Sequence, residues 1–302
     1  MQYAIETVNL SRRFGRTEAV VDLTMTVPAG SVFALVGPNG AGKTTTIKTL
    51  MNLLRPSAGE ARMLGADSRA LGRATLRRIG YVSENQVLPE WMSVTDLMAY
   101  CRPFYPTWDT SFADALLTQM DLPRARPLKH CSRGMKMKAA LVVSLAYRPE
   151  LIVMDEPFAG LDALVREEFS QGILEVAGGE RPWTVFISSH DIDEVERLAD
   201  WIGIINHGRL ALAEPVSALL ARFRQIEFQM DGQACVAADG PITWLGPEAA
   251  SHTIRFVDSA FSESDVGAAV RGRYPSALDI TVTPMSLRQI FIALARVYRL
   301  SE

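Results

Sequence analysis

The chain has 302 residues and a formal net charge of −3, from 31 Lys plus Arg against 34 Asp plus Glu. At roughly 150 residues per domain this length predicts about two domains, and a hydrophobic content of 48% is enough to fill their cores. The balanced charge gives no basic footprint for nucleic acid, and no apolar run approaches the roughly 20 residues of a membrane span. Because the N-terminus and the three cysteines show no secretory or disulfide pattern, we expect a cytoplasmic protein without a nucleic-acid partner.

Short strands come first in chain order. Apolar residues alternate over 3–10 and 19–27, which predicts two strands, and Pro-Ala-Gly over 28–30 predicts a turn after them. The continuous apolar run over 31–36 predicts a buried strand. A helical pattern follows over 44 to about 54.

The middle of the chain alternates between strand and helix patterns. Residues 79–82 predict a short strand, and residues 93 to about 148 are mostly helical, with apolar residues spaced for buried faces. The runs over 151–154 and 184–187 are β-rich with little alternation, as in a parallel sheet covered on both faces. Helices between such strands predict an α/β fold.

The composition changes after about residue 214, because residues 215–302 contain no lysine. We therefore predict two domains, over 1–214 and 215–302, and expect the second to be a small α/β accessory domain. It shows no phosphate loop, carboxylate pair or metal pattern. Its predicted strands are 225–230, 253–257 and 279–282, and its predicted helices are 262–270 and 286–299.

A glycine-rich loop follows the strand over 31–36. Its sequence, GPNGAGKT, fits the pattern G-x-x-x-x-G-K-[ST] of a phosphate-binding loop. Glycines let the backbone point N–H groups at phosphate oxygens, and the following helix adds the positive end of its dipole. Lys43 would reach the β- and γ-phosphates, and the Thr44 hydroxyl would bind Mg²⁺. The candidate nucleotide-binding residues are Gly37, Pro38, Asn39, Gly40, Ala41, Gly42, Lys43, Thr44 and Thr45.

Two adjacent acids end the strand over 151–154. Because side chains alternate between the faces of a strand, we expect Asp155 and Glu156 to point in different directions and to have different roles. We expect Asp155 to hold Mg²⁺ and Glu156 to act as the general base that polarises a water. The residues alone therefore predict a Mg²⁺-dependent P-loop NTPase.

Beyond these residues the chain resembles the ATPases of the ATP-binding cassette (ABC) family, over about residues 3–214. The segment AGLD ending at Asp162 matches the family's D-loop, and SSH ending at His190 matches its switch histidine, which the resemblance places at the γ-phosphate. Phe14 lies where the family has an aromatic under the adenine, and packing in the core is the alternative for this ring. The resemblance implies an ABC-type ATPase domain with a mixed sheet and a helical subdomain over about 85–148, and it implies ATP and Mg²⁺ as cofactors.

Two motifs depart from the family pattern. The signature Leu-Ser-Gly-Gly-Gln corresponds here to Cys-Ser-Arg-Gly-Met over 131–135, which retains Ser132 and Gly134 as candidate nucleotide contacts. The glutamine of the family's Q-loop corresponds to Glu84, whose carboxylate would approach Mg²⁺ or its waters. Gln86, two residues later, is the alternative.

The resemblance also implies an assembly. In the family two ATPase subunits form a head-to-tail dimer, so the partner would be a second copy or a homologous subunit. Each ATP would lie between the phosphate loop of one subunit and the signature segment of the other. The segments SRGMK over 132–136 and PMSLRQIF over 284–291 resemble bacterial subunits that pair with ABC-2-type permeases. This implies an integral membrane permease partner, a peripheral location on the inner face of the cell membrane, and a role in energising export or import.

An aromatic cluster lies between the Q-loop and the signature. Aromatics are enriched at protein interfaces, so it is a candidate docking surface for the permease, and the core of the helical subdomain is the alternative for some rings. The accessory domain could regulate, dimerise or stabilise the protein. The cluster consists of Trp91, Tyr100, Phe104, Tyr105 and Trp108.

Two other functions compete with a transporter subunit. A soluble ABC ATPase acting on ribosomes or DNA is disfavoured by the single cassette and by the lack of a basic linker. A regulatory module that holds ATP with little turnover is disfavoured by the presence of both Glu156 and His190, whereas the altered signature is compatible with it.

Overall fold

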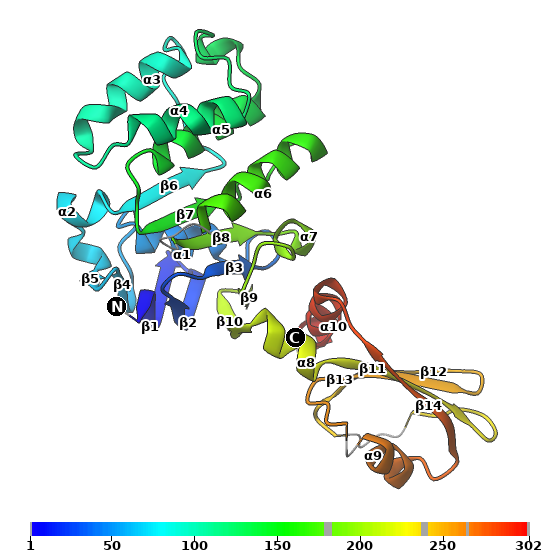
Figure 1. The fold of residues 1–302 in the computed structure, drawn as a ribbon. Coiled ribbons are helices and arrows are strands. Elements are labelled where there is room, and N and C mark those ends of the chain that lie inside the picture. The colour runs from blue at the N-terminus through cyan, green and yellow to red at the C-terminus, as the bar shows by residue number, and fades with distance from the viewer. Residues whose placement is uncertain (1, 178–182, 237–240, 264–265, 301–302) are drawn as a thin grey trace. The chain divides into compact units, whose positions relative to one another are not determined.

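The computed structural model describes residues 2–177, 183–236, 241–263 and 266–300. The chain divides into two units, Met1–Ala213 and Glu214–Glu302 (Figure 1). None of the helices in these described ranges is long and apolar enough to cross a membrane.

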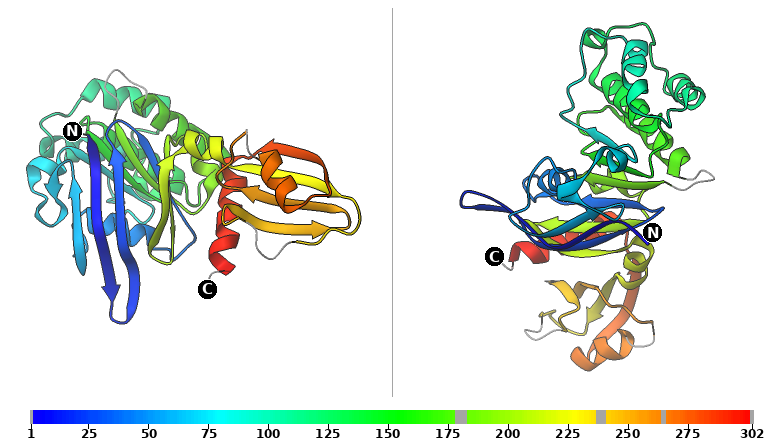
Figure 2. Two further views of the ribbon diagram at one scale, coloured as in Figure 1. Left: turned by 90° about the horizontal axis from the view of Figure 1, so that it is seen from below. Right: turned by 90° about the vertical axis from the view of Figure 1, so that its left-hand side faces the viewer.

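The first unit contains two sheets. One has the strand order β2-β1-β4-β5, with antiparallel neighbours, and β1 and β2 are its long strands (Figure 2). The other has the order β10-β9-β3-β8-β7-β6, and its neighbours from β9 to β6 are parallel. The strands are β1 Tyr3–Phe14, β2 Thr17–Pro28, β3 Val32–Val36, β4 Ala58–Met63, β5 Ala66–Asp67, β6 Ile79–Ser83, β7 Leu151–Asp155, β8 Thr184–Ser189, β9 Trp201–Asn206 and β10 Arg209–Pro215.

Helix α1, Lys43–Leu50, shares one apolar core with both sheets. Its buried Ile47 and Leu50 lie in the same cluster as Phe33 of β3, Val153 of β7 and Ile5 of β1. The central strands β3, β7 and β8 are buried at every residue, as expected for parallel strands covered on both faces. This core holds the start of α1 against the carboxyl ends of the parallel strands.

The predicted helical region forms a layer of its own beyond β6 (Figure 1). Apolar residues of this region, such as Leu97, Leu116 and Leu141, are buried, as their helical spacing predicts. Its elements are α3 Val94–Cys101, η2 Arg102–Phe104, α4 Thr110–Gln119, η3 Leu128–His130 and α5 Arg133–Leu145. The remaining helices of the first unit are η1 Ser68–Ala70, α2 Arg73–Leu76, α6 Ala163–Ala177 and α7 Ile192–Val195.

The second unit is a four-stranded antiparallel sheet of order β12-β13-β11-β14 with helices. Phe228 and Phe256 of the sheet pack with Val266 and Val270 of α9 in a separate core. The elements are α8 Val216–Arg222, β11 Arg224–Met230, β12 Trp244–Ala250, β13 Thr253–Asp258, α9 Val266–Arg273, β14 Ala277–Pro284 and α10 Leu287–Leu300.

Some predicted boundaries were wrong. The first helix ends at Leu50 rather than near residue 54, because Asn52 takes a φ of +58° and the Leu53 and Leu54 N–H groups both return to the Lys48 carbonyl oxygen. Strands β4, β5, β9, β10 and β12 were not predicted. The predicted helix over 262–270 is observed as α9, and residues 264–265 lie outside the described part of the chain.

Candidate functional site

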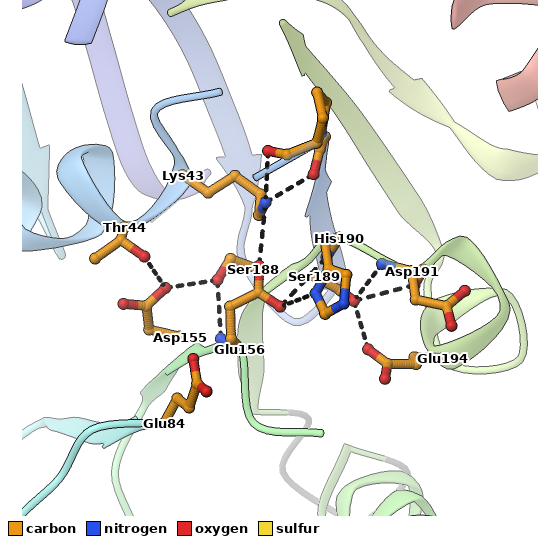
Figure 3. Close-up of polar contacts among 12 residues, drawn as sticks. Lys43, Thr44, Glu84, Asp155, Glu156, Ser188, Ser189, His190, Asp191 and Glu194 are labelled. Atoms are coloured by element: carbon orange, nitrogen blue, oxygen red, sulfur yellow. Dashed lines mark hydrogen bonds and ion pairs between the residues drawn. The ribbon is translucent and has the colours of Figure 1, made fainter. Parts of the chain in front are cut away.

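The candidate residues gather where four parallel strands end. Asp155, the last residue of β7, is paired in register with Ser83 of β6 and Ser188 of β8, and Val36 of β3 is paired with Ser189. The loops that follow these strands therefore leave the sheet at one edge. Figure 3 shows that their polar side chains converge there. This edge is where open α/β sheets bind ligands.

The phosphate loop runs from β3 into α1. Lys43 begins the helix, is 5% exposed, and its ammonium donates to the carbonyl oxygens of Gly37 (2.7 Å) and Pro38 (3.1 Å). A β-carbon on Gly37 would lie 2.1 Å from the Ile205 carbonyl oxygen, so this position has no room for a side chain. Gly42, with a φ of +106°, adopts a backbone conformation that favours glycine. The loop is thus closely packed on the side that faces the core.

Asp155 lies beside the start of α1. Its Oδ1 accepts hydrogen bonds from the hydroxyls of Thr44 (3.0 Å) and Ser188 (2.8 Å), and the residue is only 3% exposed. Burial raises the pKa of Asp155 above its ordinary value, and the two hydroxyl donors act in the opposite direction. The site therefore contains a buried carboxylate next to a hydroxyl, both of which are oxygen ligands.

Glu156 lies between a lysine and a histidine. Its Oε1 is 3.1 Å from Nζ of Lys43, and its Oε2 is 2.7 Å from Nδ1 of His190 (Figure 3). The backbone N–H of Glu156 donates to the Ser188 hydroxyl at 3.0 Å. Side-chain alternation was the wrong reason for the different positions of the two acids. Glu156 has left the strand and has a φ of +50°, a conformation uncommon for residues other than glycine.

Behind His190 lies a polar network of Ser189, Glu194 and Arg166, in which the serine and the glutamate are buried. The Ser189 hydroxyl donates to Glu194 at 2.5 Å, and the other oxygen of Glu194 is 3.5 Å from the Arg166 guanidinium. Arg166 also donates to the Leu161 carbonyl oxygen at 3.3 Å. Burial raises the pKa of Glu194. The network joins the segment before α6 to the segment that carries His190, and no spacing in the sequence marks it.

Glu84 lies just after β6, next to the carboxylate pair. Its backbone N–H donates to the Asp155 carbonyl oxygen at 2.9 Å, whereas its side chain accepts a hydrogen bond from Arg133 at 2.7 Å. Gln86, the alternative candidate, accepts a hydrogen bond from the Ser83 N–H at 3.4 Å. The structure therefore places the Glu84 backbone at the strand ends and pairs its carboxylate with the start of α5.

The remaining candidates lie at the edges of this group. Phe14 is 44% exposed, with the Arg12 guanidinium 4.4 Å from the centre of its ring, so it does not pack in the core. Ser132 and Asp162 bond to the helices that follow them, because each accepts a backbone N–H three residues later, at 3.2 and 3.0 Å. Thr45 is half-buried within α1. Among the predicted side chains, direct contacts join Lys43, Glu156 and His190 in one set and Thr44 and Asp155 in another, and Ser188 links the two sets.

The chain is similar to ATP-binding proteins of transporters. The family described as "ABC transporter" matches residues 20–159. The bacitracin transport ATP-binding protein BcrA of Bacillus licheniformis is 32% identical over 236 residues, which cover 77% of this chain and 77% of that protein. The lantibiotic transport ATP-binding protein SrtF of Streptococcus pyogenes is 35% identical over 206 residues, covering 68% and 87%. A solved ATP-binding subunit of an ABC transporter matches with a TM-score of 0.65 at 26% identity, covering 72% and 92%.

Proposed function

Because this chain belongs to the ABC transporter family, as an ATP-binding subunit that hydrolyses ATP, we propose that it works as a head-to-tail dimer that powers a separate membrane permease. The observation that carries the proposal is the chain of contacts from Lys43 through Glu156 to His190, beside a loop of phosphate-binding sequence. The relatives are named for transport, which favours this function over a soluble ATPase of ribosomes or DNA.

The phosphates of ATP are proposed to lie over the loop at the start of α1. Backbone N–H groups and the positive end of a helix favour phosphate oxygens at such a loop. Lys43, which now bonds to two carbonyl oxygens and to Glu156, would exchange these partners for the β- and γ-phosphates. The exposed ring of Phe14 is available to stack on adenine. The other residues proposed to bind the nucleotide are Gly37, Pro38, Asn39, Gly40, Ala41, Gly42 and Thr45.

The oxygen atoms of Thr44 and Asp155, beside Lys43, are suitable ligands for Mg²⁺. The Thr44 hydroxyl and the Asp155 carboxylate lie 3.0 Å apart, and Mg²⁺ takes hard oxygen ligands of this kind, with substrate phosphates and water completing its shell. A bound Mg²⁺ would supply charge that neutralises the phosphates during transfer. Thr44, Asp155 and Glu84 are the residues that we propose hold it.

Glu156 is the proposed general base, and His190 is proposed to contact the γ-phosphate. Once Lys43 pairs with phosphate, Oε1 of Glu156 becomes free to accept a proton from the attacking water. The His190 ring and its backbone N–H, at 2.7 and 3.3 Å from Oε2, fix the direction of the carboxylate. The arrangement supports a base that is held in place before the substrate arrives.

The starts of α5 and α6 are proposed to face the nucleotide of the other subunit, which is a second copy or a homologous ATPase. Ser132 and Asp162 are exposed there, each directly before the first residue of its helix. A β-carbon on Gly134 would lie 2.8 Å from a methyl group of Val165, so the two helices meet closely at this point. We propose that Ser132, Gly134 and Asp162 contact ATP or the partner across the dimer.

The permease is proposed to dock on the exposed aromatics of the helical region. Trp91, Tyr100 and Phe104 are 75%, 56% and 55% exposed, which is unusual for large apolar side chains. Tyr105 instead stacks on Tyr147 with ring centres 3.8 Å apart, and Trp108 is partly buried, so both contribute to packing. An ABC-2-type permease bound to the three exposed rings would hold the protein on the inner face of the membrane.

Replacing Glu156 with Gln tests the proposed chemistry. The amide keeps the size of the side chain but accepts no proton, so we expect ATP binding to persist and kcat to fall by about 10²–10⁴-fold. A dimer should then accumulate with MgATP. The measurements are titration with a fluorescent ATP analogue, phosphate release and gel filtration. Glu150→Gln, which removes the exposed ion pair with Arg78, is the matched control and should hydrolyse ATP normally. Unchanged turnover in Glu156→Gln would show that another group is the base.

A further inference from the structure

Two of the residues that depart from the family pattern contact each other. Glu84 occupies the position of the Q-loop glutamine, and Arg133 occupies a glycine position of the signature. Nη2 of Arg133 lies 2.7 Å from Oε1 of Glu84. Two substitutions that are 49 residues apart in the chain therefore form one ion pair.

The pair joins two parts of the proposed ATP site. The Glu84 backbone is fixed beside the proposed metal ligands, because its N–H donates to the Asp155 carbonyl oxygen at 2.9 Å. Arg133 is the first residue of α5, directly after Ser132, whose hydroxyl caps that helix. The ion pair thus connects the metal side of one site to the surface that faces the partner's nucleotide.

Arg133 also lies against the D-loop. A β-carbon on Gly160 would come within 2.9 Å of Nη1 of Arg133 and 3.1 Å of its Cζ. Gly160 has a φ of +69°, a conformation that favours glycine, and the lack of a side chain lets the guanidinium approach closely. The Arg133 side chain therefore fits between Glu84 and Gly160, and its position is specified by both.

This ion pair is weak enough to exchange. The Arg133 and Glu84 side chains are 49% and 33% exposed and share one hydrogen bond. An exposed pair of this kind changes an equilibrium constant by at most about fivefold. A divalent cation is a stronger partner for a carboxylate than a solvated guanidinium, and the Arg133 charge opposes a cation that approaches Glu84.

We propose that Arg133 is a positioning residue that holds the Glu84 carboxylate in the nucleotide-free chain. On binding of MgATP, Glu84 exchanges Arg133 for the metal, and Arg133, at the start of α5, is released from the carboxylate. The inference rests on the proposed function, in which Glu84 is a ligand of Mg²⁺. Through this exchange, the signature segment of a subunit responds to the nucleotide bound in that same subunit.

The test measures how much Mg²⁺ is needed to bind a fluorescent ATP analogue, before any hydrolysis. Because Arg133 competes for Glu84, Arg133→Gln should lower the half-saturating Mg²⁺ concentration by up to about fivefold, whereas Glu84→Gln should raise it. Arg133→Lys keeps the charge and should behave as the wild type does. In the double variant, Arg133→Gln should add nothing to Glu84→Gln, because its partner is gone.

A neighbouring ion pair gives the matched control. Lys136 and Glu90 lie 2.9 Å apart and join the same two segments away from Asp155, so Glu90→Gln should leave the Mg²⁺ requirement unchanged. The proposed exchange is contradicted if Arg133→Gln leaves the half-saturating Mg²⁺ concentration unchanged. It is also contradicted if Arg133→Gln shifts that concentration equally in the wild-type and the Glu84→Gln backgrounds. Should Arg133→Gln fail to fold, Arg133→Lys and Glu84→Gln decide, since an unshifted Glu84→Gln also overturns the proposal. A wild-type chain that binds no ATP analogue would refute the proposed function itself.

Discussion

At the scale of single residues, Asp155 is a buried carboxylate whose surroundings favour the binding of a cation. It is 3% exposed, and burial raises its pKa despite hydrogen bonds from Ser188 and Thr44. The folded chain therefore binds this proton more tightly than the unfolded chain does. The contribution of Asp155 to stability is fully present below its ordinary pKa of 3.8 and is lost as the pH rises through the raised value. At neutral pH the buried charge destabilises the nucleotide-free protein.

Asp155→Asn should accordingly stabilise the nucleotide-free protein while abolishing Mg²⁺-dependent nucleotide binding. The amide retains an acceptor for Thr44 and Ser188, so we expect a higher Tm at pH 7 and a difference that shrinks as the pH falls toward about 4. Thermal unfolding across this pH range measures it, and a lower Tm at pH 7 would contradict the argument. Asp109 gives the opposite sign, because its hydrogen bonds with the Phe112 N–H and Arg148 lower its pKa. Asp109→Asn should therefore lower the Tm at neutral pH.

The residues that could be predicted are those that belong to a local sequence pattern of known chemistry. Lys43 and Thr44 follow from the spacing of the phosphate loop, and Asp155 follows from an apolar strand that ends in acid. The contact between Glu84 and Arg133 could not be predicted, because it joins two loops that only the fold brings together. The positive φ of Glu156 was also inaccessible, since no glycine or asparagine marks the turn.

At the scale of secondary-structure elements, two helix caps allow an effect on stability to be distinguished from an effect on function. Ser93 caps α3 in a capping box with Asp96, and Ser132 caps α5 by accepting the Met135 N–H. Replacing either serine with Ala should lower the free energy of unfolding by about 1 kcal/mol. We expect only Ser132→Ala to weaken ATP-driven dimer formation as well, because α5 begins on the surface proposed to face the partner. Equal loss of the dimer in both variants, measured by gel filtration with MgATP, would show that stability alone is responsible.

The same scale shows why some strands could not be predicted. Strand β12 contains Gly246 and Pro247, and five of its seven residues are exposed, so it lacks the apolar alternation that marks a strand. It forms because it pairs with β13 in the sheet. By contrast, β7 and β8 are buried at every residue, and their apolar runs over 151–154 and 185–187 made them recognisable.

At the scale of the whole molecule, the two units have separate cores. One apolar core of the first unit contains residues of both sheets and α1, and one core of the second contains residues between 226 and 282. The proposed ATP residues and the exposed aromatic rings all belong to the first unit. We therefore propose that the second unit is an accessory domain that neither binds ATP nor provides the aromatic docking surface.

Removing the second unit tests this division. A chain that ends at Pro215 keeps β10 whole, so we expect it to fold and to bind ATP with the affinity of the full chain. Purified from solubilised membranes, both chains should recover the same polytopic partner, because the docking rings Trp91, Tyr100 and Phe104 are retained. Loss of nucleotide binding would show that the units depend on each other. Loss of the membrane partner from the shortened chain alone would show that residues 216–302 are needed for docking. Recovery of either chain only with ribosomes or nucleoids would refute the proposal that a permease is the partner.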